Sequence, residues 1–198
     1  MTLVLGIGTS SPALSLALFE DGVLKACEHR MIGRGHAEAL VPAIAALMDA
    51  HAQGRPADAL VVDIGPGSFT GIRVGLAAAL ALGLAWNAPV TGVMASSLVA
   101  AGAFAQAPGA AGVTVLLDAG RGQLFVQAID RAFAQGPLVT LLPEDLACPP
   151  DMPAAGSGAA LASAGPDMAS LFLVPAALRA LPATAHYVRP PDAQLPVS

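Results

Sequence analysis

The chain has 198 residues, 55% of them hydrophobic and 12% charged, with a formal net charge of −5. This balance excludes a disordered protein, because a chain of this length and hydrophobicity can bury about 70% of the surface that its unfolded form exposes. The longest uninterrupted apolar run, at 74–86, has 13 residues, whereas about 20 are needed to cross a bilayer. We therefore expect no membrane span and, because the N-terminus lacks the basic region of a signal peptide, a cytoplasmic protein.

The N-terminal residues predict a three-stranded antiparallel meander. Apolar runs at 3–7 and 14–19 are separated by a turn with the sequence GTSSP. The second run alternates with period two, as a half-buried strand does. A tight turn at 20–22 then leads to a third strand through 23–26.

Crossover connections follow the meander. Apolar residues at helical spacing predict an amphipathic helix between His36 and His51. A short apolar run at 59–64 is typical of a buried strand. After a glycine-rich loop, a second helix is expected at about 72–86, followed by a strand at 90–93.

The helix at 72–86 has no polar face, because every residue between Arg73 and Asn87 is apolar or glycine. A helix that is hydrophobic all round must be covered on more than one side. A sheet covers one side, so a second helix layer or a partner chain must cover the other. Ser96 or Ser97 is expected to cap a further helix that runs to about Gln106.

The second half of the chain repeats the pattern of the first. A segment rich in Gly, Pro and Ala at 106–112 predicts a lobe boundary. A strand at 113–117, a turn at 118–122 and a strand at 123–129 follow it, which suggests a duplicated architecture. Beyond residue 143 only a short helical stripe near 174–181 is apparent.

The loop at 65–71 lies between a predicted strand and a predicted helix. Backbone N–H groups and the helix dipole favour an anion at such a place. The loop is not a Walker A motif, since Gly71 is followed by Ile72 and Arg73 instead of lysine and a hydroxyl residue. Alternatively, its glycines serve a tight turn and close helix packing, with Ser68 and Thr70 as helix caps.

Two predicted hairpin turns, at 6–11 and 118–122, are rich in glycine or hydroxyl side chains. Two such turns facing one cleft could hold phosphate groups. Hairpins require these residue types in any case, so the turns alone do not establish a ligand.

Few side chains are arranged for metal or nucleic-acid binding. Nine basic residues are outnumbered by 14 acidic ones, whereas a protein that binds nucleic acid alone needs several cations on one face. No two of the four histidines stand at i, i+4 spacing, so no metal site is expected. Cys27 and Cys148 form no disulfide or zinc motif and are expected to be buried as small hydrophobic side chains.

The bacterial TsaB family, also called YeaZ, has a signature that resembles GPGSFTGIRVG at 65–75, eleven consecutive positions. Its other motifs resemble HAEALVP at 36–42, GV followed by SSL at 92–98, and DAGRGQLF at 118–125. The family's closing Tyr-Leu-Arg is similar to Tyr187-Val188-Arg189. The resemblance covers about residues 1–130 and is slight beyond them.

This resemblance implies an α/β protein with the actin-like, ribonuclease H-like (ASKHA) fold, in two lobes that each have a mixed sheet and flanking helices. The expected N-terminal lobe is 1–105, with the signature and the partner-binding helices. The expected C-terminal lobe is 106–198 and is shortened.

The family resemblance also implies a function in tRNA threonylcarbamoyladenosine (t6A) modification. Family members are non-catalytic partners of TsaD, which transfers a threonylcarbamoyl group to the adenosine next to the anticodon; TsaC and the ATPase TsaE complete the pathway. The chain is expected to form a heterodimer with TsaD, to meet TsaE through that complex, to contact tRNA only indirectly and to form a homodimer when alone. It requires no cofactor of its own, although weak ATP or ADP binding in the complex is possible.

Two departures from related sequences argue against catalysis. TsaD chains carry a histidine metal site that corresponds to 94–99 here, where no histidine is present. No metal and no metalloprotease activity are therefore expected. Gly8 stands where the family usually has the aspartate that actin-like ATPases place near metal and phosphates. The turn at 156–159 is similar to the adenosine-side turn of the fold.

Two sets of residues follow as candidate sites. The interface with TsaD is expected to include His36, Leu40, Ile44, Leu47, Arg73, Leu76, Leu80 and Leu84. Possible nucleotide or phosphate contacts are Thr9, Ser10, Gly67, Ser68, Gly120 and Arg121. The alternative function is a small ATP-dependent phosphotransferase or hydrolase of the actin-like fold.

Overall fold

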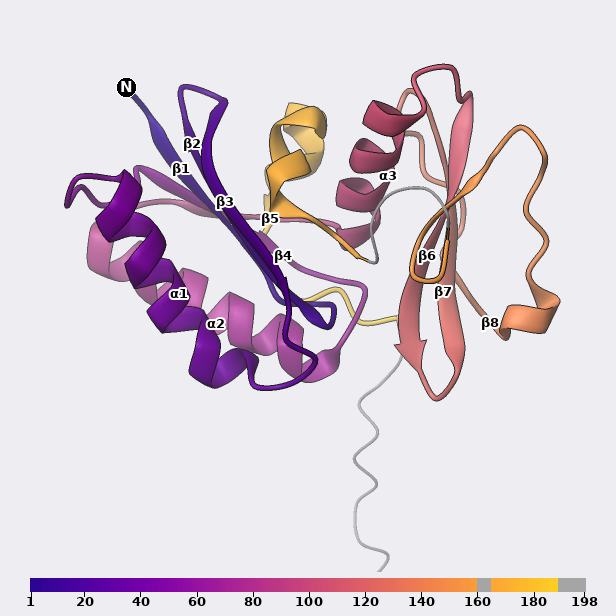
Figure 1. Cartoon of the computed structure of the whole chain (residues 1–198), viewed down its shortest axis with the longest axis horizontal. Coiled ribbons are helices and arrows are strands. Elements are labelled where there is room, and N and C mark those ends of the chain that lie inside the picture. The colour runs from indigo at the N-terminus through magenta and orange to yellow at the C-terminus, as the bar shows by residue number, and fades with distance from the viewer. Residues whose placement is uncertain (160–164, 189–198) are drawn as a thin grey trace, which may run out of the picture.

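The computed structural model describes residues 1–159 and 165–188. In these ranges the chain forms a six-stranded sheet and a four-stranded sheet. The two sheets lie side by side, with helix α3 (Ala95–Gln106) between them (Figure 1).

The six-stranded sheet begins with the predicted meander and continues with parallel strands. In spatial order its strands are β10 (Leu181–Pro182), β5 (Val90–Val93), β4 (Ala59–Asp63), β1 (Leu3–Gly8), β2 (Ala13–Glu20) and β3 (Val23–Met31). Strands β1, β2 and β3 pair antiparallel, whereas β4 pairs parallel to β1 and β5 parallel to β4. The predicted change from hairpins to crossovers is confirmed.

Two helices cover one face of this sheet (Figure 1). Helix α1 (His36–His51) has the predicted bounds. Helix α2 (Phe69–Trp86) begins before the predicted residue 72, because the Ser68 side chain caps it by accepting a hydrogen bond from the Gly71 N–H at 3.2 Å.

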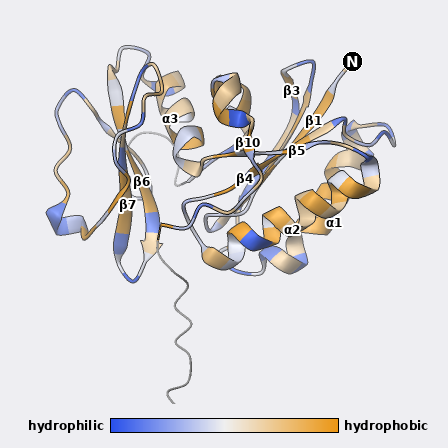
Figure 2. Ribbon diagram, turned by 180° about the vertical axis from the view of Figure 1, so that it is seen from behind, coloured by the Kyte–Doolittle hydropathy of each residue, from blue (hydrophilic) through white to orange (hydrophobic). Residues whose placement is uncertain are grey.

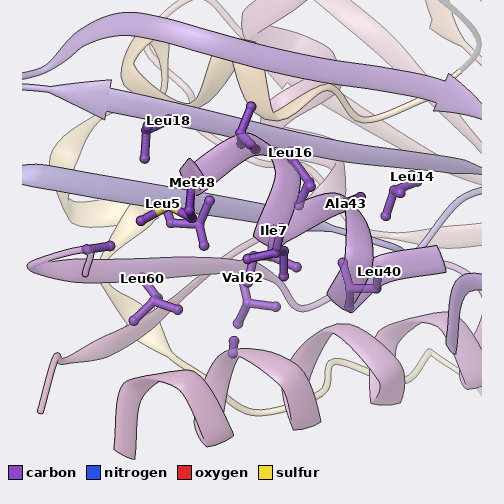
Figure 3. Close-up of a cluster of buried hydrophobic side chains, with 14 of the residues drawn as sticks. Leu5, Ile7, Leu14, Leu16, Leu18, Leu40, Ala43, Met48, Leu60 and Val62 are labelled. Carbon is purple, nitrogen blue, oxygen red and sulfur yellow. The ribbon is translucent and has the colours of Figure 1, made fainter. Parts of the chain in front are cut away.

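The main core lies between this sheet and these two helices, as Figure 3 shows. Alternate residues of the strands point toward the helices, as the period-two pattern requires. Fully buried examples are Leu5, Ile7, Leu14, Leu16, Leu18, Leu60 and Val62. Leu40, Ala43 and Met48 of α1 meet them from the other side.

The opposite face of the sheet is covered by α3 and by the short 3-10 helix η2 (Met168–Leu173). Buried side chains of the two strands β2 and β4 pack there with Leu98 and Met168. Asp167 connects η2 to the sheet. Its carboxylate caps the helix by accepting a hydrogen bond from Ala169 N at 2.9 Å, and it also accepts one from Ser15 Oγ of β2 at 3.2 Å.

The four-stranded sheet repeats the order of the first one. Its strands are β8 (Val139–Leu141), β7 (Gln123–Asp130), β6 (Gly112–Gly120) and β9 (Ala154–Gly156). β6, β7 and β8 form an antiparallel meander and β9 pairs parallel to β6, as β4 does to β1. The predicted duplication is confirmed. Between β8 and β9 the 3-10 helix η1 (Pro143–Asp145) stands where the first lobe has α1, so this lobe is shorter.

The division of the chain into 1–105 and 106–198 stays a prediction. The C-terminal residues that the structure describes return to the first sheet, however, because β10 pairs with β5 and His186 N donates to Ile64 O at 2.8 Å. Residues 181–186 therefore pack with the first lobe although they follow the second in sequence.

Three local expectations are wrong. Ser96 and Ser97 do not cap α3, because the helix begins earlier, with Met94 at its N-cap position, and both serines are buried inside the first turn. Cys27 and Cys148 are exposed, Cys27 because it lies on the edge strand β3. The helical stripe near 174–181 is only the 3-10 helix η3 (Ala176–Arg179).

Helix α2 is, by length and composition, apolar enough to cross a membrane, with a mean hydropathy of 1.6 over 18 residues. A core helix of a soluble protein passes the same test. One side of α2 packs on the sheet through Ile72, Leu76 and Ala79, and only a third of the window is buried. The apolar character of its other side therefore needs a separate explanation.

Candidate functional site

The glycines of the segment 65–75 bring α2 against the turn that follows β1. A Cβ atom on Gly67 would stand 2.2 Å from Ser10 O. On Gly71 it would stand 2.0 Å from Thr9 O. Real Cβ atoms essentially never come this close to another heavy atom, and here the obstacle is backbone. Of the two interpretations of this loop, close packing is the one that the geometry supports.

The polar atoms of the β1–β2 turn are used inside the protein. Thr9 Oγ1 donates to Gly71 O at 2.8 Å, and Ser68 N donates to Ser10 O at 2.7 Å. Ser10 Oγ donates to the carboxylate of Asp63. Thr9 is fully buried and Ser10 is 3% exposed. The expectation that Thr9 contacts a nucleotide is wrong for this reason, and the Ser10 hydroxyl already has a partner.

Asp63, at the end of β4, is the most perturbed ionisable group of the site. Its side chain is fully buried, and Gly65 N donates to Oδ1 at 2.8 Å. Burial raises the pKa of Asp63 to about 6, against hydrogen bonds from Ser10 and Gly65 that lower it. Asp63 is not among the predicted site residues, although a polar side chain inside the apolar run 59–64 is a signal in the sequence.

A cleft of about 930 Å³ lies beside this turn. Segments of both lobes line it, chiefly 10–12, 33–38, 66–71, 117–120 and 186–188. Among the predicted nucleotide contacts, Ser10, Gly67, Ser68 and Gly120 line the cleft. Thr9 and Arg121 are not among its lining residues. The structure thus brings together four of the six predicted residues.

The polar groups in the cleft include three that carry or can carry positive charge, Arg34, His36 and His186. His36 is the first residue of α1, with Gly35 at the N-cap position, so the histidine does not cap the helix. Its Nε2 lies 3.3 Å from Ala13 O instead. Ser157 lines both this cleft and a neighbouring cavity of about 460 Å³, which places the turn at 156–159 beside the cleft.

Among residues 1–159 and 165–188, no group of three or more His, Cys, Asp or Glu side chains is placed to hold a metal ion. The lining of the cleft also contains the carboxylates of Glu38 and Asp118, so it offers hydrogen bonding and charged groups of both signs.

Half of the predicted interface residues belong to the chain's own core. Leu40, Ile44, Leu47 and Leu76 are between 1% and 9% exposed and pack with the sheet. Their inclusion in a partner interface is wrong, because helical spacing marks an apolar row without showing which surface the row faces. His36, Arg73, Leu80 and Leu84 stay accessible.

The accessible residues of α2 form a row on the side of the helix away from the sheet. Leu84 is 87% exposed and Leu80 is 50% exposed. With Ala77 and Arg73 they follow a spacing of four, three and four residues, which places them on one face. On α1, Val41 is 61% exposed, a residue that the sequence analysis did not select. Figure 2 shows both helices as largely hydrophobic. We call the exposed side chains of Val41, Ala77, Leu80 and Leu84 the docking face.

An aromatic cluster holds Arg73 at one end of this row. The Arg73 guanidinium carbon lies 3.8 Å from the centre of the Phe69 ring, and Arg73 Nε donates to Tyr187 Oη at 3.1 Å. Tyr187 belongs to the closing motif at 187–189 but is not among the predicted site residues; Arg189 lies outside the described residues. The available signal was that Tyr187 is the one tyrosine of the chain.

Comparison with known proteins gives one family. The family model described as TsaD, tRNA N6-adenosine threonylcarbamoyltransferase, matches residues 30–137, more than half of the chain. An uncharacterized protein of Mycobacterium tuberculosis is 33% identical over 190 residues, which cover 93% of this chain and 82% of that protein. The tRNA threonylcarbamoyladenosine biosynthesis protein TsaB of Escherichia coli is 32% identical over 123 residues, which cover 62% of this chain and 52% of that protein.

A solved structure has the same fold over nearly its whole length. YeaZ from Pseudomonas aeruginosa superimposes with a TM-score of 0.74 at 27% identity, covering 92% of this chain and 99% of that one. The predicted α/β fold with two mixed sheets and flanking helices is confirmed.

Proposed function

This chain belongs to the TsaB (YeaZ) family of tRNA threonylcarbamoyladenosine biosynthesis, and we propose that it is a non-catalytic subunit that binds TsaD. One observation carries the proposal, namely the docking face on α1 and α2. Leu84 is almost fully in solvent in the isolated chain. Fully burying one leucine side chain is worth about 1.5 to 3 kcal/mol, so a few such residues stabilise a complex.

The composition of the docking face suits a helical partner. Alanine side chains surround Leu80 and Leu84, at positions 77, 81 and 85. Small side chains let the axis of a second helix approach toward the lower end of the usual 8–10 Å range, at about 8 Å. An exposed apolar patch of this kind on a monomer typically marks a site of protein–protein interaction.

TsaD fits this surface because the TsaD family model matches a stretch of this chain that includes α1 and α2. A partner with the same two helices can present an equivalent surface, and the two helix pairs would pack as a bundle. A second copy of this chain offers that surface too. A homodimer is therefore expected when TsaD is absent.

The test is co-expression of the chain with its cognate TsaD, followed by co-purification and size-exclusion chromatography. Leu84→Asp is expected to abolish the complex, because it puts a charge at the most exposed leucine of the docking face. Its fold should persist, because the Leu84 side chain packs on almost nothing in the monomer. Leu173→Asp is the matched control, since Leu173 is 55% exposed and lies on η2, on the other face of the sheet. A complex that survives Leu84→Asp and Leu80→Asp together would refute the docking face.

The cleft supports at most weak nucleotide binding in this proposal. Ser68 and Gly120 line it from opposite lobes and could contact a phosphate of ATP or ADP. The rival function, an ATP-dependent phosphotransferase or hydrolase, cannot use the hydroxyls of Thr9 and Ser10 for a phosphate, because Thr9 Oγ1 and Ser10 Oγ are both engaged inside the protein. Steady ATP turnover by the purified chain with magnesium would establish the rival instead.

Contact with tRNA is proposed to be indirect, through TsaD. A formal net charge of −5 disfavours binding to phosphate backbones by this chain alone. TsaE is likewise expected to meet the chain only in the complex, in the cytoplasm. A filter-binding assay with tRNA at low salt should show retention by the complex and none by the isolated chain.

A further inference from the structure

Arg73 is fixed in place by two aromatic side chains from distant parts of the sequence. Its guanidinium carbon lies 3.8 Å from the centre of the Phe69 ring and 5.9 Å from that of Tyr187. The two rings are 4.8 Å apart and inclined at 37°. A guanidinium group over an aromatic face is attracted by the ring, so the rings restrict where this side chain can go.

The C-terminal segment brings Tyr187 to this position. β10 pairs with β5 at the edge of the sheet, and His186 N then donates to Ile64 O at 2.8 Å. The next residue, Tyr187, reaches the first turn of α2 and accepts a hydrogen bond from Arg73 Nε at 3.1 Å. The closing motif and the signature, 114 residues apart in sequence, thus meet at the end of the docking face.

The guanidinium keeps donors for a further partner. Tyr187 Oη takes the Nε donor, and the structure gives no other hydrogen bond to Arg73 within the described residues. No carboxylate of those residues lies within 4 Å of it, whereas other arginines such as Arg30 and Arg55 have acidic neighbours. Arg73 is also exposed. Its two terminal nitrogens are therefore available in solvent, in a fixed orientation.

We propose that Arg73 binds a carboxylate of TsaD at the edge of the docking face, and that Tyr187 is the positioning residue that holds the guanidinium ready. This inference rests on the proposed function. A restrained guanidinium loses less side-chain freedom on binding than a mobile one, and its planar fork matches the two oxygens of a carboxylate. A ring of polar residues around an apolar centre is the usual composition of a protein interface.

The position of Arg73 favours a protein carboxylate over a phosphate. Arg73 lies in one row with Ala77, Leu80 and Leu84 of α2. Phe69 and Tyr187 line the cleft, whereas Arg73 itself is not among its lining residues. A protein surface that covers Leu80 and Leu84 would reach Arg73 in the same contact.

The test is the dissociation constant of the complex with purified TsaD, measured over a series of salt concentrations. Arg73→Gln is expected to weaken binding about tenfold at low salt and to reduce the dependence on salt, because an ion pair is lost. Arg73→Lys should restore the salt dependence and only part of the affinity, since lysine is a point charge without the planar fork. Arg30→Gln, at an exposed arginine on β3, is the matched control and should change nothing.

Tyr187→Phe separates the positioning of Arg73 by the Tyr187 hydroxyl from the packing of the Tyr187 ring. It keeps the ring on Phe69 and removes the oxygen that holds Arg73 Nε. We expect binding about threefold weaker at unchanged thermal stability. In a double-mutant cycle, Tyr187→Phe should have little further effect once Arg73→Gln is present. If the two effects add independently, Tyr187 does not act through Arg73 and the positioning role is refuted.

The outcomes for Arg73 and for the proposed function are distinguishable. If TsaD does not bind the unaltered chain, the proposed function fails. If TsaD binds, Leu84→Asp abolishes binding and Arg73→Gln leaves it unchanged, only the carboxylate proposal fails. If Arg73→Gln weakens ATP or tRNA binding by the complex but not the affinity for TsaD, the guanidinium serves a phosphate and the proposal is overturned.

Discussion

The turn between β1 and β2 and the turn between β6 and β7 occupy equivalent places in the two lobes, yet their environments are opposite. Thr9 and Ser10 in the first turn are buried under α2. Gly120 and Gly122 in the second turn are exposed, and a Cβ atom on either would meet nothing within 4 Å. The same class of turn is thus a packing element in one lobe and open surface in the other.

Helix α2 makes this difference. Gly67 and Gly71 let its N-terminal end rest on backbone atoms of the first turn. In the second lobe both glycines of the turn have positive φ, at 73°, so they are needed for the shape of the turn itself. Glycine in a motif therefore signals either close approach or an unusual backbone, and only the neighbours show which.

The largest effect is expected from Gly71→Ala. The new Cβ would stand 2.0 Å from Thr9 O. The Cβ is attached directly to the helix backbone and Thr9 O is a backbone atom, so neither can rotate away. We expect the free energy of unfolding to fall by about 3 kcal/mol or more. Urea denaturation followed by circular dichroism measures it. A decrease in the free energy of unfolding of less than about 0.5 kcal/mol would show that α2 does not pack closely against the turn.

The second effect concerns pH and the buried Asp63 below the first turn. Burial raises its folded pKa to about 6, above the ordinary value of 3.8. The folded state therefore binds this proton more tightly than the unfolded state. The protonated Asp63 therefore contributes to the free energy of unfolding. This contribution is fully present below the pKa of the unfolded state and is lost as the pH rises through about 6. Unfolding at a series of pH values measures it.

Asp63→Asn is the comparison that isolates this effect. The amide cannot ionise but keeps an oxygen that can accept from Gly65 N. Relative to the unaltered chain, the variant should gain about 2 kcal/mol of stability between pH 4 and pH 7. Parallel pH profiles of the two proteins would mean that Asp63 has an ordinary pKa in the folded state.

A smaller effect is expected from Thr9→Val, which keeps the shape of the side chain and removes the hydroxyl. The hydrogen bond from Thr9 Oγ1 to Gly71 O is lost in a fully buried place. The free energy of unfolding should fall by about 1.5 kcal/mol. Thermal unfolding of Thr9→Val beside Thr9→Ser, which retains the donor, separates the hydrogen bond from packing.

The smallest effect is expected from Gly122→Ala in the open turn. Nothing obstructs the added methyl group, and only the positive φ of 73° opposes it. The cost should be about 1 kcal/mol, less than half of that at Gly71. Equal losses at the two positions, measured under the same urea conditions, would remove the distinction between the two turns.

Local patterns predicted the elements of this protein well. The bounds of α1 and β5 agree with the prediction because the spacing of apolar side chains and the adjacent glycine and proline residues define them within a short window. The repeated meander was also readable, since each lobe starts with the same order of strands and turns. These features depend on neighbours in sequence.

The two faces of α2 show where that information ends. The face toward the sheet carries the large side chains of Ile72 and Leu76 and also three glycines, Gly71, Gly75 and Gly83. The solvent face carries Leu80 and Leu84. Both faces are apolar, so periodicity could not tell them apart, and the need for glycine depends on how closely the helix approaches its neighbours in the folded protein.

Sequence alone was sufficient for the fold class, the family resemblance and the order of the elements, because these follow from short-range periodicity and contiguous motifs. It left open which apolar row meets a partner, whether the signature glycines hold an anion or pack, and what Tyr187 does. Those answers came from Thr9 lying beneath Gly71 and from Tyr187 lying beside Arg73. Residues 62 and 114 positions apart meet only when the sheet has formed, so no local pattern could have paired them.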